Sequence, residues 1–230
     1  MRVCIIPARS GSKRIPRKNI REFCGNPMIS WSIRAAQDSG SFDQIIVSTD
    51  DDEIAEVAHS FGAQAPFRRS PDLADDHTPT IPVIADAINQ LDLNDQTPVC
   101  CLYATAPFVL PEYIQEGCRL LEETQASFVM SVTTFAFPIQ RALRREETGQ
   151  VEMFDPDKMN VRSQDLEDAW HDAGQFYWAT AATWKGDKGI FECGAYGLQL
   201  PRHRVQDIDT DEDWVHAEWM MQALKSETPE

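Results

Sequence analysis

The hydrophobic positions of this 230-residue chain alternate between short continuous apolar runs and longer stretches with helical spacing. A short apolar run is typical of a buried strand, whereas apolar residues three and four positions apart indicate a helix with one buried face. Over the first 135 residues the pattern predicts strands at residues 3–6, 44–48, 99–103 and 128–133, and helices over 27–40, 51–62, 82–91 and 111–124. Strands separated by helices of this length are typical of right-handed βαβ units and a mainly parallel sheet.

The alternation breaks between residues 136 and 172. This stretch carries Pro138, Pro156 and the charged residues 144–147, and it has little periodicity. A polar segment of this length inside a compact domain is usually functional, disordered or an interface. The alternation returns at 175–182, in a short strand near Leu198 and in a last helix over 211–224. We therefore expect one α/β domain, residues 1–230, with a Rossmann-like sheet and a protruding insert at about 136–172.

Composition and charge narrow the class of protein. Hydrophobic residues make up 42% and charged residues 25% of the chain, which is typical of a globular protein. No apolar run approaches the roughly 20 residues that cross a bilayer, so no membrane partner is expected. The net charge of −16 argues against a nucleic-acid partner, because phosphate backbones require a basic face. An anionic ligand would therefore need a local group of cations or a divalent metal.

Cysteine usage indicates a reducing compartment. The six cysteines, at positions 4, 24, 100, 101, 118 and 193, include no C-x-x-C pair. Cys4, Cys100 and Cys101 fall in apolar runs, where cysteine acts as a small hydrophobic residue. We expect reduced thiols and a cytoplasmic protein.

The loop after the first strand concentrates positive charge in this acidic chain. Residues 8–19, called the basic loop below, combine small residues with the cations Arg9, Lys13, Arg14, Arg17 and Lys18. Small residues let backbone N–H groups approach a polyanion, and the cations neutralise its charge. The loop fits neither G-x-x-x-x-G-K-[ST] nor G-x-G-x-x-G. It predicts a triphosphate site; the alternative is an ordinary solvated basic loop.

The basic loop resembles the signature of the cytidylyltransferases that activate nine-carbon, sialic-type sugar acids, with the CMP-KDO synthetases as more distant relatives. That signature reads Pro-Ala-Arg-Gly-Gly-Ser-Lys-x-x-x-x-Lys-Asn. Ser10 stands where its first glycine is usual, which is tolerable if the φ angle of Ser10 is negative. The resemblance implies a nucleotidyltransferase fold of the glycosyltransferase A type, with CTP as a substrate. It implies catalytic roles for Arg9, Lys13 and Lys18, and nucleotide binding by Ala8, Arg9, Gly11, Ser12, Lys18 and Asn19.

A second family-like segment runs from position 69 to position 80. It is similar to the Arg-Pro-x-x-Leu-Ala-x-Asp segment that closes over cytosine and ribose in this family. By that resemblance Arg69 donates to the pyrimidine O2, while Thr78 and Thr80 reach N4 and the ribose. The simpler interpretation is a polar loop with Thr80 as a helix N-cap, and both can hold together. We expect His77 to be a loop residue, and helix capping explains residues 48–51.

An acidic cluster lies near the end of the chain. Asp207 and Asp209 are one residue apart, so on an extended backbone their side chains face the same way and can share a divalent cation. Thr210, Asp211 and Asp213 can cap or favour the following helix, which explains part of the cluster without a metal. The cluster resembles the family's Asp-Ile-Asp-Thr-x-x-Asp motif, whose two aspartates hold Mg²⁺. Asp207 and Asp209 are therefore the expected Mg²⁺ ligands.

The expected sugar side departs from the sialic acid enzymes. Where those typically carry Leu-Gln-Pro-Thr-Ser-Pro-Leu-Arg, residues 102–109 read Leu-Tyr-Ala-Thr-Ala-Pro-Phe-Val, so Tyr103 replaces a glutamine and Val109 an arginine. Residues 173–177 read Ala-Gly-Gln-Phe-Tyr in place of Asn-Gly-Ala-Ile-Tyr. This combination resembles the pseudaminic acid branch of the family. The resemblance implies sugar binding by Tyr103, Arg162, Gln164, Gln175 and Tyr177.

The resemblance also implies a reaction and an assembly. The C2 hydroxyl of a nine-carbon 2-keto sugar acid would attack CTP, releasing pyrophosphate, and a homodimer would form in which the insert reaches the partner's sugar site. Alternatives are CMP-N-acetylneuraminate or CMP-legionaminate synthesis, transfer to a neutral sugar, a Mg²⁺-dependent phosphatase and a non-catalytic nucleotide-binding regulatory protein. Retention of both the loop lysines and the aspartate pair favours an enzyme. No histidine is placed as a general base.

Overall fold

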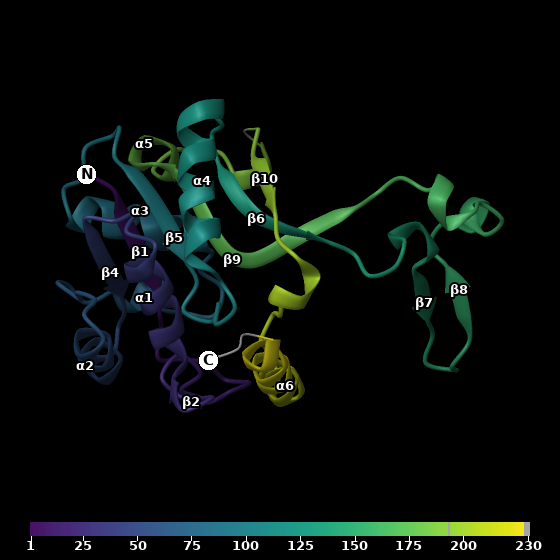
Figure 1. Cartoon of the computed structure of the whole chain (residues 1–230), viewed down its shortest axis with the longest axis horizontal. Helices are drawn as coiled ribbons and strands as arrows, with labels where there is room; N and C mark the ends of the chain where they lie inside the picture. The colour runs from purple at the N-terminus through teal and green to yellow at the C-terminus, as the bar shows by residue number, and fades with distance from the viewer. Residues whose placement is uncertain (193, 228–230) are drawn as a thin grey trace.

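A six-stranded sheet in the order β10-β6-β9-β5-β1-β4 forms the centre of the molecule (Figure 1). The computed structural model describes residues 1–192 and 194–227. Strand β1 is parallel to β4 and β5, and β10 is parallel to β6, whereas β9 runs antiparallel to both β5 and β6. The predicted mainly parallel sheet is thus confirmed, with one reversed strand near its middle.

The strands and helices have the following bounds. The strands are β1 (Val3–Pro7), β2 (Glu22–Phe23), β3 (Asn26–Pro27), β4 (Gln44–Ser48), β5 (Pro98–Leu102), β6 (Val129–Thr134), β7 (Leu143–Arg145), β8 (Val151–Met153), β9 (Trp170–Thr180) and β10 (Tyr196–Gln199). The helices are α1 (Met28–Asp38), α2 (Asp52–Ser60), α3 (Thr80–Gln90), α4 (Pro111–Thr124), α5 (Ala181–Trp184) and α6 (Asp211–Glu227).

Side chains of the sheet alternate between two buried layers. On β1, Cys4 and Ile6 pack into the layer formed with α1, α2 and α4, while Val3 and Ile5 pack into the layer formed with α3 and α5. This follows from the two-residue repeat of a strand, and it explains why β1 is apolar throughout. A third cluster joins α6 to the basic loop and to the β2–β3 ribbon, with Ile15, Phe23, Phe108, Ile208 and Trp214 among its buried members.

Three features differ from the sequence-based expectations. Helix α3 begins at Thr80 with Pro79 as its N-cap residue, so the prediction that Thr80 is the N-cap is wrong. Strand β9 begins at Trp170, five residues before the expected strand, because its first residues are exposed and lack an apolar run. The end of that expected strand, residues 181 and 182, instead starts the short helix α5.

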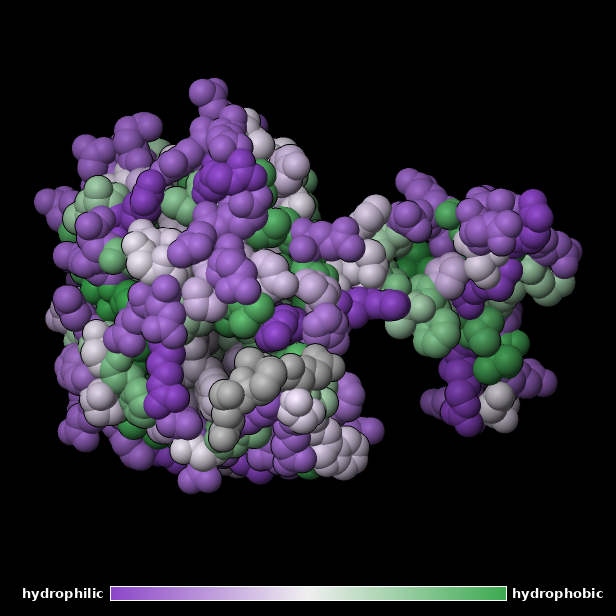
Figure 2. Space-filling view, viewed as in Figure 1, coloured by the Kyte–Doolittle hydropathy of each residue, from purple (hydrophilic) through white to green (hydrophobic). Residues whose placement is uncertain are grey.

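Residues 135–169, called the arm below, project away from the sheet between β6 and β9 (Figure 1). The arm contains the antiparallel β7–β8 pair, so it is more regular than its sequence suggested. Its surface carries exposed apolar side chains, including Phe137 at 82%, and Phe154 and Met159 at 63% each. In Figure 2 the arm shows hydrophobic surface among polar residues.

The described cysteines are free thiols. Cys4, Cys100 and Cys101 are completely buried in the sheet, as predicted, and Cys193 lies outside the described residues. None of the helices within residues 1–192 and 194–227 is long and apolar enough to span a membrane.

Candidate functional site

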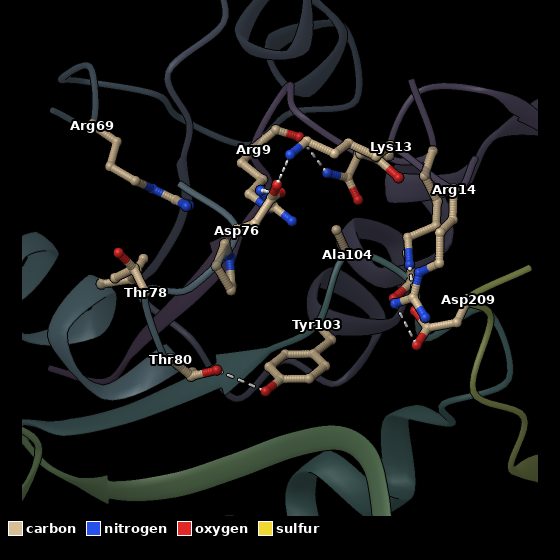
Figure 3. A pocket seen from close by; sticks show the side chains of 16 residues that line it. Arg9, Lys13, Arg14, Arg69, Asp76, Thr78, Thr80, Tyr103, Ala104 and Asp209 are labelled. Carbon is tan, nitrogen blue, oxygen red and sulfur yellow. Dashed lines mark hydrogen bonds and ion pairs between the residues drawn. The ribbon is translucent and has the colours of Figure 1, made fainter. Parts of the chain in front are cut away.

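A cavity of about 500 Å³ opens beyond the carboxyl ends of β1 and β5 (Figure 3). Ligands of open α/β sheets bind at this edge. Five cations and two carboxylates line it, so it is locally positive in a chain of net charge −16. The lining residues are Pro7, Arg9, Ser12, Lys13, Arg14, Lys18, Asn19, Arg69, Asp76, Thr78, Thr80, Val83, Tyr103, Ala104, Thr105 and Asp209.

Hydrogen bonds hold the basic loop in a folded shape. The Asn19 side chain donates to the Arg9 carbonyl at 2.9 Å, and Ser12 N donates to the Ser10 carbonyl at 3.0 Å. Ser10 does not adopt a positive φ angle, so a serine is accepted at the usual glycine position. Arg17 does adopt one, with φ of 56°, which turns the chain toward Lys18.

Asp50 anchors the basic loop from the end of β4. Its two carboxylate oxygens accept hydrogen bonds from Ser10 N at 2.9 Å and Ser10 Oγ at 2.6 Å. Burial raises the pKa of Asp50, but the bonds from Ser10 and the charge of Arg69 hold that pKa below its ordinary value. The capping explanation of residues 48–51 therefore holds for Asp51, which accepts from Ile54 N at 3.0 Å, and not for Asp50.

Two loop cations share one carboxylate at the pocket surface. Arg9 donates to Asp76 at 2.5 Å, and the Lys13 ammonium pairs with the other oxygen of the same carboxylate. Lys13 and Arg9 together lower the pKa of Asp76 to about 2. Figure 3 shows the Asp76 carboxylate close to both cations, at the wall of the cavity.

The other two loop cations of the pocket converge on the acidic cluster. Lys18 Nζ donates to the Ile208 carbonyl at 2.6 Å and lies 3.2 Å from Asp209, and Arg14 pairs with Asp209 at 2.8 Å. Ile208 is buried in the third cluster and thereby anchors the two aspartates that flank it. Asp207 does not line the cavity. Its pKa is raised by burial and by repulsion from Asp209.

Asp213 acts as the predicted capping residue. Its carboxylate accepts from Asp209 N at 3.1 Å and Thr210 N at 2.8 Å, and Thr210 Oγ1 also donates to it. Asp211 pairs with Arg21 at 2.9 Å in the first turn of α6. The carboxylates of Asp207 and Asp209 take no part in these contacts.

One side of the cavity is lined by the residues that we expected to contact the nucleotide base. Arg69 is 5% exposed, and its guanidinium donates to the Ser48 carbonyl and, at 3.2 Å, to Ser48 Oγ. Burial lowers the pKa of Arg69. The Thr80 and Tyr103 hydroxyl groups share a hydrogen bond of 2.8 Å. Burial raises the pKa of Tyr103 to about 12, so its hydroxyl stays neutral and can donate a hydrogen bond.

The remaining residues expected to bind the sugar do not line this cavity. Tyr177 lies behind Tyr103, with ring centroids 5.4 Å apart, and its hydroxyl donates to Asp172 at 2.6 Å. The buried Gln175 side chain donates to the Arg204 carbonyl at 2.5 Å. Arg162 pairs with Asp165 at 2.9 Å on the arm, which also carries Gln164.

Sequence reasoning missed the acids that organise the loop cations. Asp76 lies in the family-like segment 69–80, and Asp50 lies in the segment that helix capping was expected to explain. Nothing in their spacing shows that they meet the basic loop, 67 and 40 residues away along the chain. Arg14 was recognised as one of the loop cations but was assigned no role. In the structure it forms an ion pair with Asp209.

Comparison with known proteins identifies relatives over nearly the whole chain. The sequence model of the family described as cytidylyltransferase matches residues 3–186. The chain is 46% identical over 213 residues to pseudaminic acid cytidylyltransferase from Campylobacter jejuni, covering 92% of each protein. It is 34% identical to CMP-N,N'-diacetyllegionaminic acid synthase from Legionella pneumophila, covering 96% of each. It is 35% identical to N-acylneuraminate cytidylyltransferase B from Danio rerio, covering 94% of this chain and 50% of that protein.

Solved structures agree on the fold. CMP:2-keto-3-deoxy-manno-octonic acid synthetase, solved in complex with CTP, superposes with a TM-score of 0.73 at 14% identity, covering 97% of this chain and 99% of that chain. 4-Diphosphocytidyl-2C-methyl-D-erythritol synthase from Anaerococcus prevotii gives a TM-score of 0.64 at 15% identity, covering 96% and 97%. The expected nucleotidyltransferase fold is thereby confirmed.

Proposed function

The chain belongs to the cytidylyltransferase family, and from that premise we propose that it transfers CMP from CTP to the C2 hydroxyl of pseudaminic acid and releases pyrophosphate. The observation that carries the choice of sugar is the 46% identity to a pseudaminic acid cytidylyltransferase, against 34% and 35% for relatives named for legionaminic acid and N-acylneuraminate. Tyr103 lines the cavity, and it supports the same choice because it places a phenol ring and hydroxyl where the sialic acid enzymes usually have a glutamine amide.

The basic loop holds the triphosphate. Arg9, Lys13 and Lys18 donate to phosphate oxygens and stabilise the charge that develops on them as pyrophosphate leaves. The other loop residues that bind the nucleotide are Ala8, Gly11, Ser12 and Asn19. This assignment is supported by the folded loop and by the position of Arg9, Ser12, Lys13, Lys18 and Asn19 on the cavity wall.

The opposite wall takes the base and ribose. Arg69 donates to the pyrimidine O2, and Thr78 and Thr80 bind the exocyclic amino group and the ribose. The support is that all three side chains line the same cavity as the basic loop. Two bonds to Ser48 restrict the guanidinium of Arg69, which favours recognition of one fixed acceptor.

Asp207 and Asp209 suit Mg²⁺ by their chemistry. No group of three possible metal ligands occurs among the described residues, but Mg²⁺ commonly takes one or two carboxylates and completes its shell with substrate phosphates and water. Burial and, after it, repulsion from Asp209 raise the pKa of Asp207, and a cation would relieve that repulsion. When bound, Mg²⁺ would polarise the α-phosphate and lower the pKa of the attacking hydroxyl.

The chain positions the two reactants. The C2 oxygen of the sugar forms a bond to the α-phosphorus, the bond to the bridging oxygen breaks, and pyrophosphate leaves with its electron pair while the hydroxyl proton passes to solvent. Tyr103 borders the sugar, backed by Tyr177 and Gln175. Positioning and charge stabilisation are sufficient for phosphate transfers of this kind.

The arm completes the site of a second copy. Arg162 and Gln164 do not line the cavity of their own chain, and the arm exposes a group of apolar side chains. We therefore include a two-fold homodimer in the proposal, in which Arg162 meets the sugar carboxylate in the partner's site. Buried free thiols support a cytoplasmic location.

The test is a coupled substrate panel. The protein is incubated with Mg²⁺, one nucleoside triphosphate and one of pseudaminic, legionaminic or N-acetylneuraminic acid, and the products are identified by mass. CMP-pseudaminic acid from CTP alone is the expected result. Preferred formation of another CMP-sugar would change the substrate, whereas CTP binding without pyrophosphate release would point to a regulatory protein.

A further inference from the structure

Asp76 forms ion pairs with Arg9 and Lys13, the two cations that bind phosphate in the proposed function. Its two carboxylate oxygens are divided between Arg9 and Lys13, so both of its strongest acceptor positions face the basic loop. The contact is charge-assisted on both sides, and Lys13 and Arg9 together lower the pKa of the carboxyl. A carboxylate therefore lies where phosphate oxygens are expected to bind.

The chain builds a specific turn to present Asp76. The preceding residue, Asp75, accepts from His77 N at 2.9 Å, from Thr78 N at 2.6 Å and from Thr78 Oγ1 at 2.7 Å. These bonds close a local turn of the kind that aspartate side chains stabilise. Two adjacent acids thus have separate tasks: one shapes the turn and the other faces the cations.

The surface position of the turn allows a phosphate to replace the Asp76 carboxylate at Arg9 and Lys13. The turn lies at the surface, between the short helical turn at Pro71–Leu73 and the start of α3, and the Asp76 side chain remains 29% exposed. Ion pairs at that exposure are individually weak, so an incoming polyphosphate with several charged oxygens can replace one carboxylate. A carboxylate and a phosphate held against the same two donors would also repel each other.

We propose that Asp76 is an internal competitor of the phosphates: its carboxylate and the phosphates of CTP or pyrophosphate occupy Arg9 and Lys13 in turn. This inference rests on the proposed function. Each binding of CTP displaces Asp76, and after transfer the return of Asp76 to the two cations helps pyrophosphate to leave. The acid lowers the affinity for CTP and pyrophosphate alike and shortens the time that pyrophosphate stays bound.

Calorimetric titration of pyrophosphate and of CTP tests the exchange without requiring turnover. Asp76→Asn keeps the shape of the side chain and removes its charge, and Asp76→Ala removes the acceptor as well. Both variants should bind pyrophosphate about three- to tenfold more tightly than wild type, the range expected for losing two exposed ion pairs. In steady state the KM for CTP should fall, inhibition by pyrophosphate should strengthen, and kcat should not rise.

Asp72→Asn is the matched control. Asp72 lies in the same surface segment, and its side chain forms no hydrogen bond or ion pair with any described residue, so the variant removes the same charge without freeing Arg9 or Lys13. Its affinity for pyrophosphate should stay within twofold of wild type. A comparable gain in Asp72→Asn would mean that general charge, and not displacement, explains the effect.

The outcomes separate this role from the proposed function. If wild type binds CTP and pyrophosphate while neither Asp76 variant binds them more tightly, Asp76 is not a competitor. Weaker binding in thermally stable variants would show instead that Asp76 helps to arrange Arg9 and Lys13 for phosphate. A wild-type protein that binds neither ligand would overturn the proposed function and this inference with it.

Discussion

Ser10 and Asp50 together determine how the basic loop sits over the sheet. Both oxygens of the Asp50 carboxylate are used by one residue of the loop, and that residue is a serine where related loops have glycine. A serine adds a hydroxyl donor that glycine lacks. The loop of this chain is therefore held by one more hydrogen bond than its signature predicts, and Asp50 acts as a positioning residue.

A double-mutant cycle between Ser10→Ala and Asp50→Asn measures this contact. Hydrogen bonds to a carboxylate contribute about 1.5–3 kcal/mol, so we expect a coupling energy of about 1 kcal/mol in kcat/KM for CTP once solvent exposure is taken into account. Each single variant should raise the KM for CTP several-fold. Strictly additive effects of the two changes would show that the bond does not position the loop.

Lys18 joins the basic loop to the acidic cluster, so its loss should affect chemistry more than folding. Lys18→Ala removes a charge-assisted donor and should cost about 2–4 kcal/mol of transition-state stabilisation, which is on the order of 30- to 1000-fold in kcat/KM. Arg9→Ala should fall in the same range. Steady-state kinetics and thermal unfolding measure both. Lys185→Ala, which breaks an ion pair with Asp95 outside the cavity, is the control, and turnover by Lys18→Ala within threefold of wild type would refute the role.

Single residues show where sequence reasoning stops. The cations of the basic loop could be predicted because they are adjacent in sequence and the signature orders them. Asp50 and Asp76 could not be assigned, because their partners lie far away along the chain and only the arrangement of the strands brings them together. Gln175 and Tyr177 match a motif, yet packing directs their side chains to Arg204 and Asp172.

At the scale of elements, the start of α6 and the segment before it combine helix capping with the proposed metal binding, and single substitutions can separate the two. Asp213 caps the helix and holds the backbone of Asp209, whereas Asp207 is free of capping contacts. Asp213→Asn should therefore lower stability by about 0.5–1 kcal/mol, as loss of a cap does, and change the Mg²⁺ requirement little. Thermal unfolding and Mg²⁺ titration of activity measure the two effects.

Asp207→Asn should behave in the opposite way. A carboxyl whose pKa is raised in the fold destabilises the protein once the pH exceeds that pKa, so at neutral pH and without metal the variant should be at least as stable as wild type. Mg²⁺ should then raise the thermal midpoint of wild type but not of the variant, and activity should fall sharply. Equal responses of Asp207→Asn and Asp213→Asn to Mg²⁺ would assign the whole cluster to capping.

Element boundaries show a further limit of the pattern. Strands β1, β4 and β5 were predictable because they are buried on both faces and form continuous apolar runs. Strand β9 extends beyond the core, where Trp170 and His171 pair with β6 although they are exposed. Backbone pairing there needs no hydrophobic signal, so the end of the insert was predicted about three residues too late.

At the scale of the whole molecule, the arm is the feature that the sheet alone does not explain. It extends away from the body, and the cavity of the same chain contains none of its residues (Figure 1). Its apolar side chains, among them Phe137, Phe154 and Met159, are more exposed than a stable surface usually leaves residues of this size. A second copy that covers them would remove this cost and bring Arg162 toward another site.

Mixing two inactive variants tests whether sites are shared between subunits. Arg162→Ala removes the proposed sugar contact of the arm and Asp207→Asn removes a proposed metal ligand, so each variant by itself should be inactive. When subunits exchange freely, half of the dimers are mixed, and in each of these one site has an intact Asp207 and receives an intact Arg162 from its partner. The expected recovery is about a quarter of wild-type activity.

The control and the opposing outcome follow from the same geometry. Arg145→Ala also removes an exposed arginine from the arm, and in the described structure that side chain forms no ion pair, so this variant should stay active by itself. Arg162→Lys should recover little, because a single ammonium cannot form the paired bonds of a guanidinium with a carboxylate. A monomer by light scattering, or a mixture that stays inactive despite proven exchange, would exclude a shared site and return Arg162 to its local pair with Asp165.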